Sequence, residues 1–251
     1  MLFLIVATLG LNASYVIQPP TTPSPITPSL GTPKFIQAAE AHAIVGLSSL
    51  TVSFGSTPVV GDIVVVIGLT ANSGASTTDL TLVMTDNQGA GNGNGYSRLQ
   101  INLNATGNVG RVSMWCAPVT TSTGTFTITE TASSAMLPGI FALEYSGTSC
   151  NMDKFAITSG ATSPYSCGSI TTVNPKDLVL AVVFAVAATG TTTFTGPTNF
   201  TIRKSQADST IGNVASVADD IVSTTGTFAP TYGTGQNHAQ TPCTVAALVS
   251  Q

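Results

Sequence analysis

Two uninterrupted apolar runs dominate the hydrophobic pattern of the chain. Residues 62–69 read Asp-Ile-Val-Val-Val-Ile-Gly-Leu, and residues 177–184 read Asp-Leu-Val-Leu-Ala-Val-Val-Phe. Each run follows an acidic turn residue and is apolar at successive positions, so both faces of the resulting strand are apolar. We expect both runs to be central strands that are covered on each side.

Other segments alternate between apolar and polar positions. In residues 124–130, Phe126 and Ile128 fall on one face of a strand while threonines fill the other face, which is typical of a sheet with one wet side. Short segments of this kind recur at the spacing of a β-sandwich. The predicted strands are 35–37, 49–54, 62–69, 80–85, 96–102, 110–117, 124–131, 139–145, 154–158, 168–173, 177–187, 200–204, 213–223, 226–232 and 244–250.

One segment conflicts with this all-β pattern. Residues 38–43, Ala-Ala-Glu-Ala-His-Ala, favour a helix by intrinsic propensity. The segment is interpreted either as a short helical turn or as a propensity overridden by neighbouring strands.

The two halves of the chain show a weak internal repeat. Each half reads buried strand, Thr-rich strand, Asn/Gly turn and an aromatic strand that ends in arginine, Arg98 in the first half and Arg203 in the second. The pattern fits two interleaved Greek keys, the topology of a jelly roll. The sequences are too divergent to indicate a duplication. We therefore predict an all-β, jelly-roll-like antiparallel β-sandwich.

Several of these motifs together resemble a known family. Phe35-Ile-Gln, Leu50-Thr-Val-Ser-Phe, Val60-Gly-Asp-Ile-Val, Leu143-Glu-Tyr-Ser-Gly and Pro175-Lys-Asp-Leu-Val resemble the jelly-roll modules appended to secreted bacterial and phage surface proteins. The resemblance covers residues 33–251 and rests on turns and strands. It implies a fold, and roles in adhesion, glycan binding or surface structures, without a shared active site.

The N-terminus divides into two segments ahead of this domain, which we place at residues 34–251. Residues 1–17 begin with an apolar run that is shorter than the roughly 20 residues needed to span a bilayer as a helix. They are expected to be an export signal, in contact with a membrane only transiently, or a tail used in assembly. Residues 18–33 are rich in proline and predict an extended linker, either a stalk or an arm that reaches a neighbouring subunit.

Composition narrows the class of protein. Only 7% of the residues are charged, the net charge is −4, and seven Lys and Arg residues are scattered along the chain. Nucleic acid binding requires clustered positive charge, so no nucleic-acid partner is expected. Low charge with abundant Ser and Thr favours an extracellular, cell-surface or virion-surface location.

A search for catalytic or metal-binding motifs finds none. His42 and His238 stand in no metal-binding or triad spacing. Glu130 and Glu144 are possible glycosidase acids, but isolated strand acids more often face solvent. The loop at residues 86–95 has oxygens suited to Ca²⁺, yet it has one acid and lacks a closing Glu, so a flexible hairpin loop is favoured. We expect no enzyme activity, cofactor or metal.

Four cysteines fit an exported protein. Cys150 and Cys167 bracket a short excursion, so their pairing is preferred, which leaves Cys116 to join Cys243. Other pairings and free thiols stay open. Asn12, Asn104 and Asn199 stand in N-glycosylation sequons.

These observations lead to two functional hypotheses. In the first, the protein is a non-enzymatic extracellular structural subunit that self-assembles into a filament, fibre or coat. Ser14, Tyr15, Val16 and Ile17 would then add a strand to the sheet of the next subunit. In the alternative, the protein is a secreted carbohydrate-binding or adhesion module in which Tyr96, Tyr165 and Tyr232 stack on a glycan.

Overall fold

The computed structural model describes residues 31–72, 82–88, 93–103, 109–186, 193–233 and 241–251. This part of the chain contains strands and no helix that is long and apolar enough to cross a membrane. The strands are β1 (Lys34–His42), β2 (Leu47–Ser53), β3 (Ile63–Asn72), β4 (Leu82–Asp86), β5 (Ser97–Leu103), β6 (Val109–Pro118), β7 (Thr127–Ser146), β8 (Thr148–Gly160), β9 (Tyr165–Ser166), β10 (Ile170–Thr171), β11 (Leu178–Ala185), β12 (Thr201–Asp208), β13 (Asn213–Ile221), β14 (Thr227–Phe228), β15 (Thr231–Tyr232) and β16 (Thr241–Ser250).

Strands of the first half build two layers. One layer is an antiparallel sheet with the order β1-β7-β3-β6-β5, in which β3 is central, as predicted from its apolar run. The long strand β7 also belongs to the other layer, because its first part pairs with β2 and β4. Pairing of β1 with β7 continues through residues 38–42, so the helical propensity of that segment is overridden by its neighbours.

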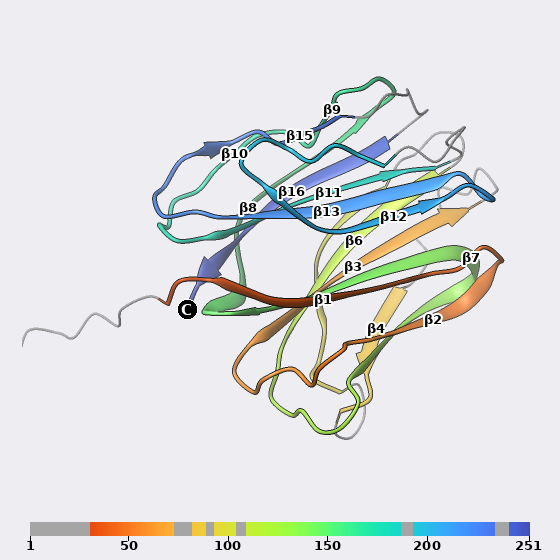
Figure 1. Cartoon of the computed structure of the whole chain (residues 1–251), viewed down its shortest axis with the longest axis horizontal. Helices are drawn as coiled ribbons and strands as arrows, with labels where there is room; N and C mark the ends of the chain where they lie inside the picture. Colours follow the sequence, from red (N-terminus) through yellow and green to blue (C-terminus); the bar gives the residue numbers. More distant parts are fainter. Residues whose placement is uncertain (1–30, 73–81, 89–92, 104–108, 187–192, 234–240) are drawn as a thin grey trace, which may run out of the picture.

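The second half repeats this construction. Its main sheet has the order β12-β13-β11-β16-β8, and β11, the second predicted central strand, lies in the middle. The short strands β9, β10, β14 and β15 pair outside this sheet and form a covering layer. Figure 1 shows the resulting four layers, from β2 and β4 at the bottom of the view to β9 and β15 at the top.

Three apolar cores fill the spaces between the layers. The middle core lies between the two main sheets and includes Ile67, Met114, Leu180 and Val182, all fully buried. The two outer cores lie between each main sheet and its covering layer. Each main sheet is therefore buried on both faces, which explains why β3 and β11 carry apolar side chains at successive positions.

The two main sheets have the same strand order. Read along each sheet, β5-β6-β3-β7-β1 of the first half corresponds to β12-β13-β11-β16-β8 of the second, in the same order along the chain. The registers agree as well. Ile63 pairs with Pro118 and Tyr145, and Leu178 at the start of β11 pairs with Ile221 and Leu248.

Irregularities in the sheets also recur at corresponding positions. In the corresponding strands β1 and β8, register shifts fall between Phe35 and Gln37 and between Met152 and Lys154. In the corresponding strands β5 and β12, they fall between Arg98 and Gln100 and between Ile202 and Lys204. The residue before each acidic turn has a positive φ, 100° at Gly61 and 64° at Lys176. Bulges are specific features of a fold, so their recurrence indicates that the two halves share one structural plan.

This arrangement confirms an all-β antiparallel sandwich and corrects its internal organisation. The sequence pattern indicated two halves whose strands interleave in one jelly roll, and gave no support for a duplication. Each half instead has its own inner sheet and its own outer layer, and the chain crosses between these two layers within each half. The two halves then stack inner sheet against inner sheet.

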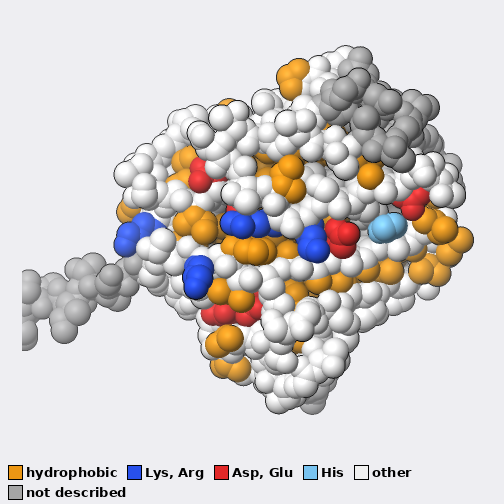
Figure 2. All heavy atoms as spheres, viewed as in Figure 1, with side chains coloured by type: hydrophobic (Ala, Val, Ile, Leu, Met, Phe, Trp, Pro, Cys, Tyr) orange, Lys and Arg blue, Asp and Glu red, His pale blue; other side chains and the backbone are white. Residues whose placement is uncertain are grey.

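Charged and aromatic side chains close one seam between the halves, where the edge strands β1 and β12 meet. The Arg203 Nε donates hydrogen bonds of 2.8 and 2.9 Å to the Asp219 carboxylate, which also accepts one of 2.7 Å from the Tyr145 hydroxyl. The Arg203 guanidinium lies 4.1 Å from the ring centroid of Phe35. Figure 2 shows charged side chains gathered in a band across this face. Asp219 is therefore buried with its charge compensated.

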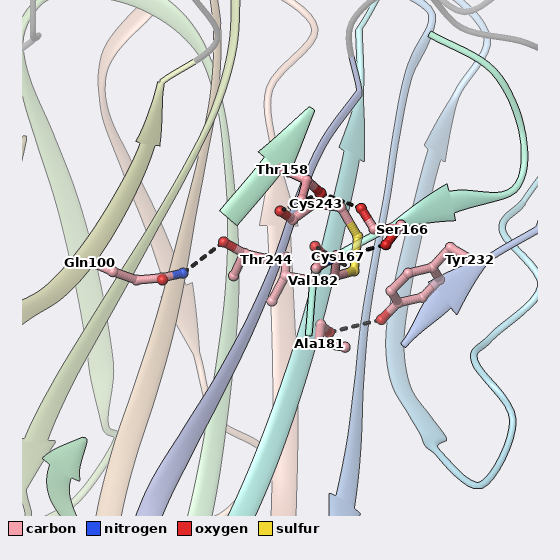
Figure 3. Close-up of a disulfide and its surroundings, with 10 residues drawn as sticks. Gln100, Thr158, Ser166, Cys167, Ala181, Val182, Tyr232, Cys243 and Thr244 are labelled. Carbon is pink, nitrogen blue, oxygen red and sulfur yellow. Dashed lines mark hydrogen bonds between the residues drawn. A yellow bond between two sulfur atoms is a disulfide. The ribbon is translucent and has the colours of Figure 1, made fainter. Parts of the chain in front are cut away.

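Two disulfides stabilise the second half and its contact with the first. Cys116 of β6 is bonded to Cys150 of β8, which joins the two main sheets, and Cys167 is bonded to Cys243 of β16 (Figure 3). The preferred pairing of Cys150 with Cys167 is therefore wrong. It was chosen because those residues are close along the chain, whereas stacking of the halves brings β6 against β8.

The disulfide pairing predicts the peptides of a non-reduced tryptic digest. Cleavage at the sparse basic residues places Cys116 and Cys150 in peptide 112–154, Cys167 in peptide 155–176 and Cys243 in peptide 205–251. We expect mass spectrometry to find peptide 112–154 alone with an internal disulfide, and peptides 155–176 and 205–251 joined. A species that joins all three peptides would contradict this pairing, because both other pairings of the four cysteines produce it.

Candidate functional site

Several residues singled out in the sequence lie outside the described residues. They are the assembly candidates Ser14, Tyr15, Val16 and Ile17, the sequon residues Asn12 and Asn104, and His238. The third sequon residue, Asn199, is described and is exposed at the entrance to β12, with a φ of 69°.

The aromatic residues proposed for glycan stacking do not form an exposed row. Tyr165 and Tyr232 are 1% and 0% exposed, and both pack edge-on against Phe194. The Tyr232 hydroxyl donates a 2.8 Å hydrogen bond to the Ala181 carbonyl oxygen (Figure 3). The expectation that these two rings stack on a sugar is therefore wrong, because both are core residues.

Tyr96 is half-buried beside the loop that the sequence suggested for Ca²⁺. In the described part of that loop, the Asp86 carboxylate accepts hydrogen bonds from the backbone N–H groups of Gln88 and Asn94. The Asn94 Oδ1 accepts hydrogen bonds from the backbone N–H groups of Thr120 and Thr121. These oxygens fix the loop to the β6–β7 connection. No group of three or more His, Cys, Asp or Glu residues within the described chain is placed to hold a metal ion.

Glu130 occupies a core position, contrary to the expectation that it faces solvent. It is fully buried between β2 and β4, in the core that also contains Ile128, and burial raises the pKa of its carboxyl group well above the usual value. Its Oε1 lies where a Cβ on Gly68 would approach to 2.5 Å. The missing side chain of Gly68 thus makes room for the carboxyl group. Alternation from Phe126 through Ile128 places residue 130 on this buried face, a signal present in the sequence.

Glu144 is also buried, at the opposite part of β7 from Glu130. The Gln37 Nε2 donates a 2.6 Å hydrogen bond to Glu144 Oε2, and the Val59 backbone N–H donates one of 2.8 Å to Oε1. Residues 130 and 144 are on the same strand, where each residue adds about 3.3 Å along the strand. Their separation is therefore far larger than the roughly 5–10 Å between the two carboxyl groups of a glycosidase. The structure does not bring the two acids together.

A second carboxyl group lies against Glu144. Asp62 is half-buried, and burial together with a hydrogen bond to Glu144 and the charge of Glu144 raises the pKa of Asp62 to about 6. The Asp62 carbonyl oxygen accepts a 2.8 Å hydrogen bond from the Val119 N–H. We call Asp62 and Glu144 the first acid pair.

The second half has an acid pair at the corresponding turn. Burial and the charge of the neighbouring Asp153 raise the pKa of Asp177 to about 7. The Asp177 carbonyl oxygen accepts a 3.1 Å hydrogen bond from the Val222 N–H, as Asp62 does from Val119. Two carboxyl groups that share a proton favour the neutral form of one. Both pairs close the turn before a central strand, which indicates a structural role.

A shallow polar groove lies on the second half. It has a volume of about 280 Å³ and is lined by Asn199, Asp220, Phe228 and Thr231, among others. Burial and the neighbouring Asp219 charge raise the pKa of Asp220. Amide, carboxyl and hydroxyl groups beside a phenyl ring are chemically suited to a sugar.

Two apolar surfaces lie elsewhere on the described chain. One is a groove of about 320 Å³ between the halves, lined by Ile44, Val45, Met136 and Ile211, among others. The other is on β8, where Phe155 is 53% exposed and Ile157 is 44% exposed. The sequence analysis did not single out either surface.

Comparison with known proteins gives no assignment. No protein-family model, curated protein or solved structure matches the chain. The function is therefore inferred from the sequence and the geometry of the described residues.

The acid pairs predict how stability depends on pH. The folded pKa values of about 6 for Asp62 and about 7 for Asp177 lie above the ordinary value of 3.8. Folding therefore favours the protonated groups, and their contribution is present below about pH 4 and is lost as the pH rises through 6 to 7. After allowance for solvent screening, the loss of each pair's contribution should lower the free energy of unfolding by about 1 kcal/mol over that pH range.

Denaturant titrations between pH 4 and pH 8 test this expectation. Asp62→Asn and Asp177→Asn should each flatten the decline in unfolding free energy, whereas Glu40→Gln, a change at an exposed acid of β1, should leave it unchanged. Glu130 contributes in the same direction in every variant, so the differences isolate the pairs. Equal pH slopes in the Asn variants and the parent would contradict the assignment.

Proposed function

We propose that the protein is a non-enzymatic extracellular structural subunit that self-assembles into a surface filament, fibre or coat through its N-terminal tail. The observation that carries the proposal is the place where the tail joins the sandwich. The Gly31 N–H donates to the carbonyl oxygen of Gln251, whose own N–H donates a 3.0 Å hydrogen bond to the Gly147 carbonyl oxygen. Gly31, the first described residue, is thus anchored beside the C-terminal residue Gln251 at one end of the sandwich (Figure 1).

The composition of the tail and the roles of the acids support this proposal. Residues 1–17 combine an apolar run with the segment Ser-Tyr-Val-Ile, whose aromatic and β-branched residues favour a strand, and residues 18–30 contain five prolines. Such a chain has the chemistry of an assembly segment on a stiff spacer. The two possible glycosidase acids are buried, Glu130 in a core and Glu144 beside a turn, which supports a structural interpretation over a catalytic one.

The location belongs to the same proposal. The two disulfides are compatible with an oxidising environment. Only 7% of the residues carry charge, and Ser and Thr are abundant along the chain. We place the subunit outside the cell or on a cell or virion surface, where disulfides persist.

Removal of the tail tests the proposal. A variant lacking residues 1–17 should remain folded and monomeric, because the sandwich keeps its three cores and loses the assembly segment. The parent protein should form polymers under the same conditions, measured by sedimentation velocity and electron microscopy. A variant lacking only residues 1–11 should still polymerise, because it keeps Ser14–Ile17. Normal polymers from the variant lacking residues 1–17 would rule out tail-mediated assembly.

The polar groove of the second half favours a second candidate function, carbohydrate binding. Asn199 and Asp220 could bond sugar hydroxyl groups while Phe228 packs on the ring. In that case, binding on a glycan array should fall at least about tenfold in Asp220→Ala, with unchanged binding by Asp62→Asn as the control. Equal binding by Asp220→Ala and the parent would remove this groove as a glycan site.

A further inference from the structure

The β8 strand provides a free edge at the end of the second main sheet. It pairs with β16 on one side, and no described strand pairs with its other side. Phe155 and Ile157 are two residues apart on this strand and are both exposed, so they lie on the same face. A sheet edge with unpaired backbone groups and apolar side chains is a template for a further strand.

The corresponding strand of the first half shows that this apolar pair is not required by the fold. Counted from the shared bulge, Phe155 and Ile157 of β8 correspond to Ala38 and Glu40 of β1. β1 therefore carries a small residue and a charge where β8 carries two large apolar residues. Natural proteins usually protect sheet edges with charges or bulges. On β8 the bulge and Lys154 precede Phe155, which leaves the following residues without such protection.

We propose that this edge of β8 is the acceptor for residues Ser14–Ile17 of a second copy of the chain, which add as an antiparallel strand. The inference rests on the proposed function, because it assigns the receptor for the assembly tail. Tyr15 and Ile17 have the same two-residue spacing as Phe155 and Ile157, so both apolar pairs can lie on one face. Main-chain hydrogen bonds supply affinity, and the apolar pairs set the register.

The spacer favours a second copy over the same chain. Residues 18–30 contain five prolines and no glycine, and in polyproline conformation they extend about 40 Å. To reach its own β8, the chain would have to reverse at Gly31, which lies beside Gly147 at the start of that strand. An arm in polyproline conformation would instead carry the segment towards another molecule. Because the donor and acceptor are different surfaces, repeated addition gives an open polymer wherever the rotation between copies does not close a ring.

The acceptor is tested by placing charges on the edge. Phe155→Lys with Ile157→Lys, in the full chain, should abolish polymers, because two ammonium groups oppose Tyr15 and Ile17. The matched control is Ile44→Lys with Val45→Lys, which places the same charges on another exposed apolar surface. Control protein should polymerise as the parent does. Polymers from the β8 variant, or their loss in the control variant alone, would overturn the assignment to β8 while leaving tail-mediated assembly intact.

Mixing two monomeric variants provides the decisive measurement. The β8 variant keeps the tail and loses the acceptor, whereas the variant lacking residues 1–17 keeps the acceptor and loses the tail. Each alone should be monomeric, and an equimolar mixture should form a 1:1 dimer in sedimentation velocity. No dimer from two folded variants would overturn the proposal. If the full-length parent itself fails to polymerise, the proposed function fails instead.

A synthetic peptide covering residues 12–18 keeps the test independent of whether the β8 variant folds. The peptide should bind the variant lacking residues 1–17 and slow amide hydrogen exchange in residues 155–160. A peptide in which Tyr15 and Ile17 are replaced by Ser should bind about tenfold more weakly, because two apolar cross-strand pairs are lost. If the peptide slows hydrogen exchange in a strand other than β8, the assignment to this edge is wrong. If β8 of the monomeric parent is protected from exchange independently of protein concentration, the tail binds its own chain and not a second copy.

Discussion

Burial of both faces of each main sheet is the constraint on which this structure depends. The sheets built around β3 and β11 present apolar side chains on each side, and burial of one such side chain contributes roughly 1.5–3 kcal/mol. Each half covers its outer face with its own short strands, but neither half covers its inner face. The halves must therefore stack, and Gly147 alone links β7 to β8. The seam between β1 and β12, the disulfide between the sheets and the position of Gly31 beside Gln251 accompany that contact.

Features that depend on local pattern could be predicted from the sequence. The unbroken runs beginning at Ile63 and Leu178 identified the central strands, because a strand with apolar side chains on both faces must be covered on each side. The helical propensity of residues 38–43 was overridden because β7 offers eight paired positions to β1. The alternation through Phe126 and Ile128 already placed Glu130 inside, and the general tendency of strand acids to face solvent was the weaker guide.

Features that depend on stacking could not be predicted in the same way. Cys116 lies next to Cys150 only because β6 packs against β8 across the middle core. Tyr232 looked available to a ligand in the sequence, but its ring closes the outer core of the second half. The separation of the halves into different sheets was hidden because the repeat is carried by bulges, turns and register, with little identity between side chains. The exposed pair on β8 became visible only by comparison with β1.

The disulfide between Cys116 and Cys150 gives the sandwich a definite response to mechanical force. In an assembly of the proposed kind, tension enters through Gly31 into β1 and leaves through β8. The hydrogen bonds between β1 and β7 lie across that pull and would break together in shear, whereas the β8 strand is covalently attached to β6 of the opposite sheet. Load could then pass from one sheet to the other through this bond, and β8 could not separate from β6 without a chemical reductant.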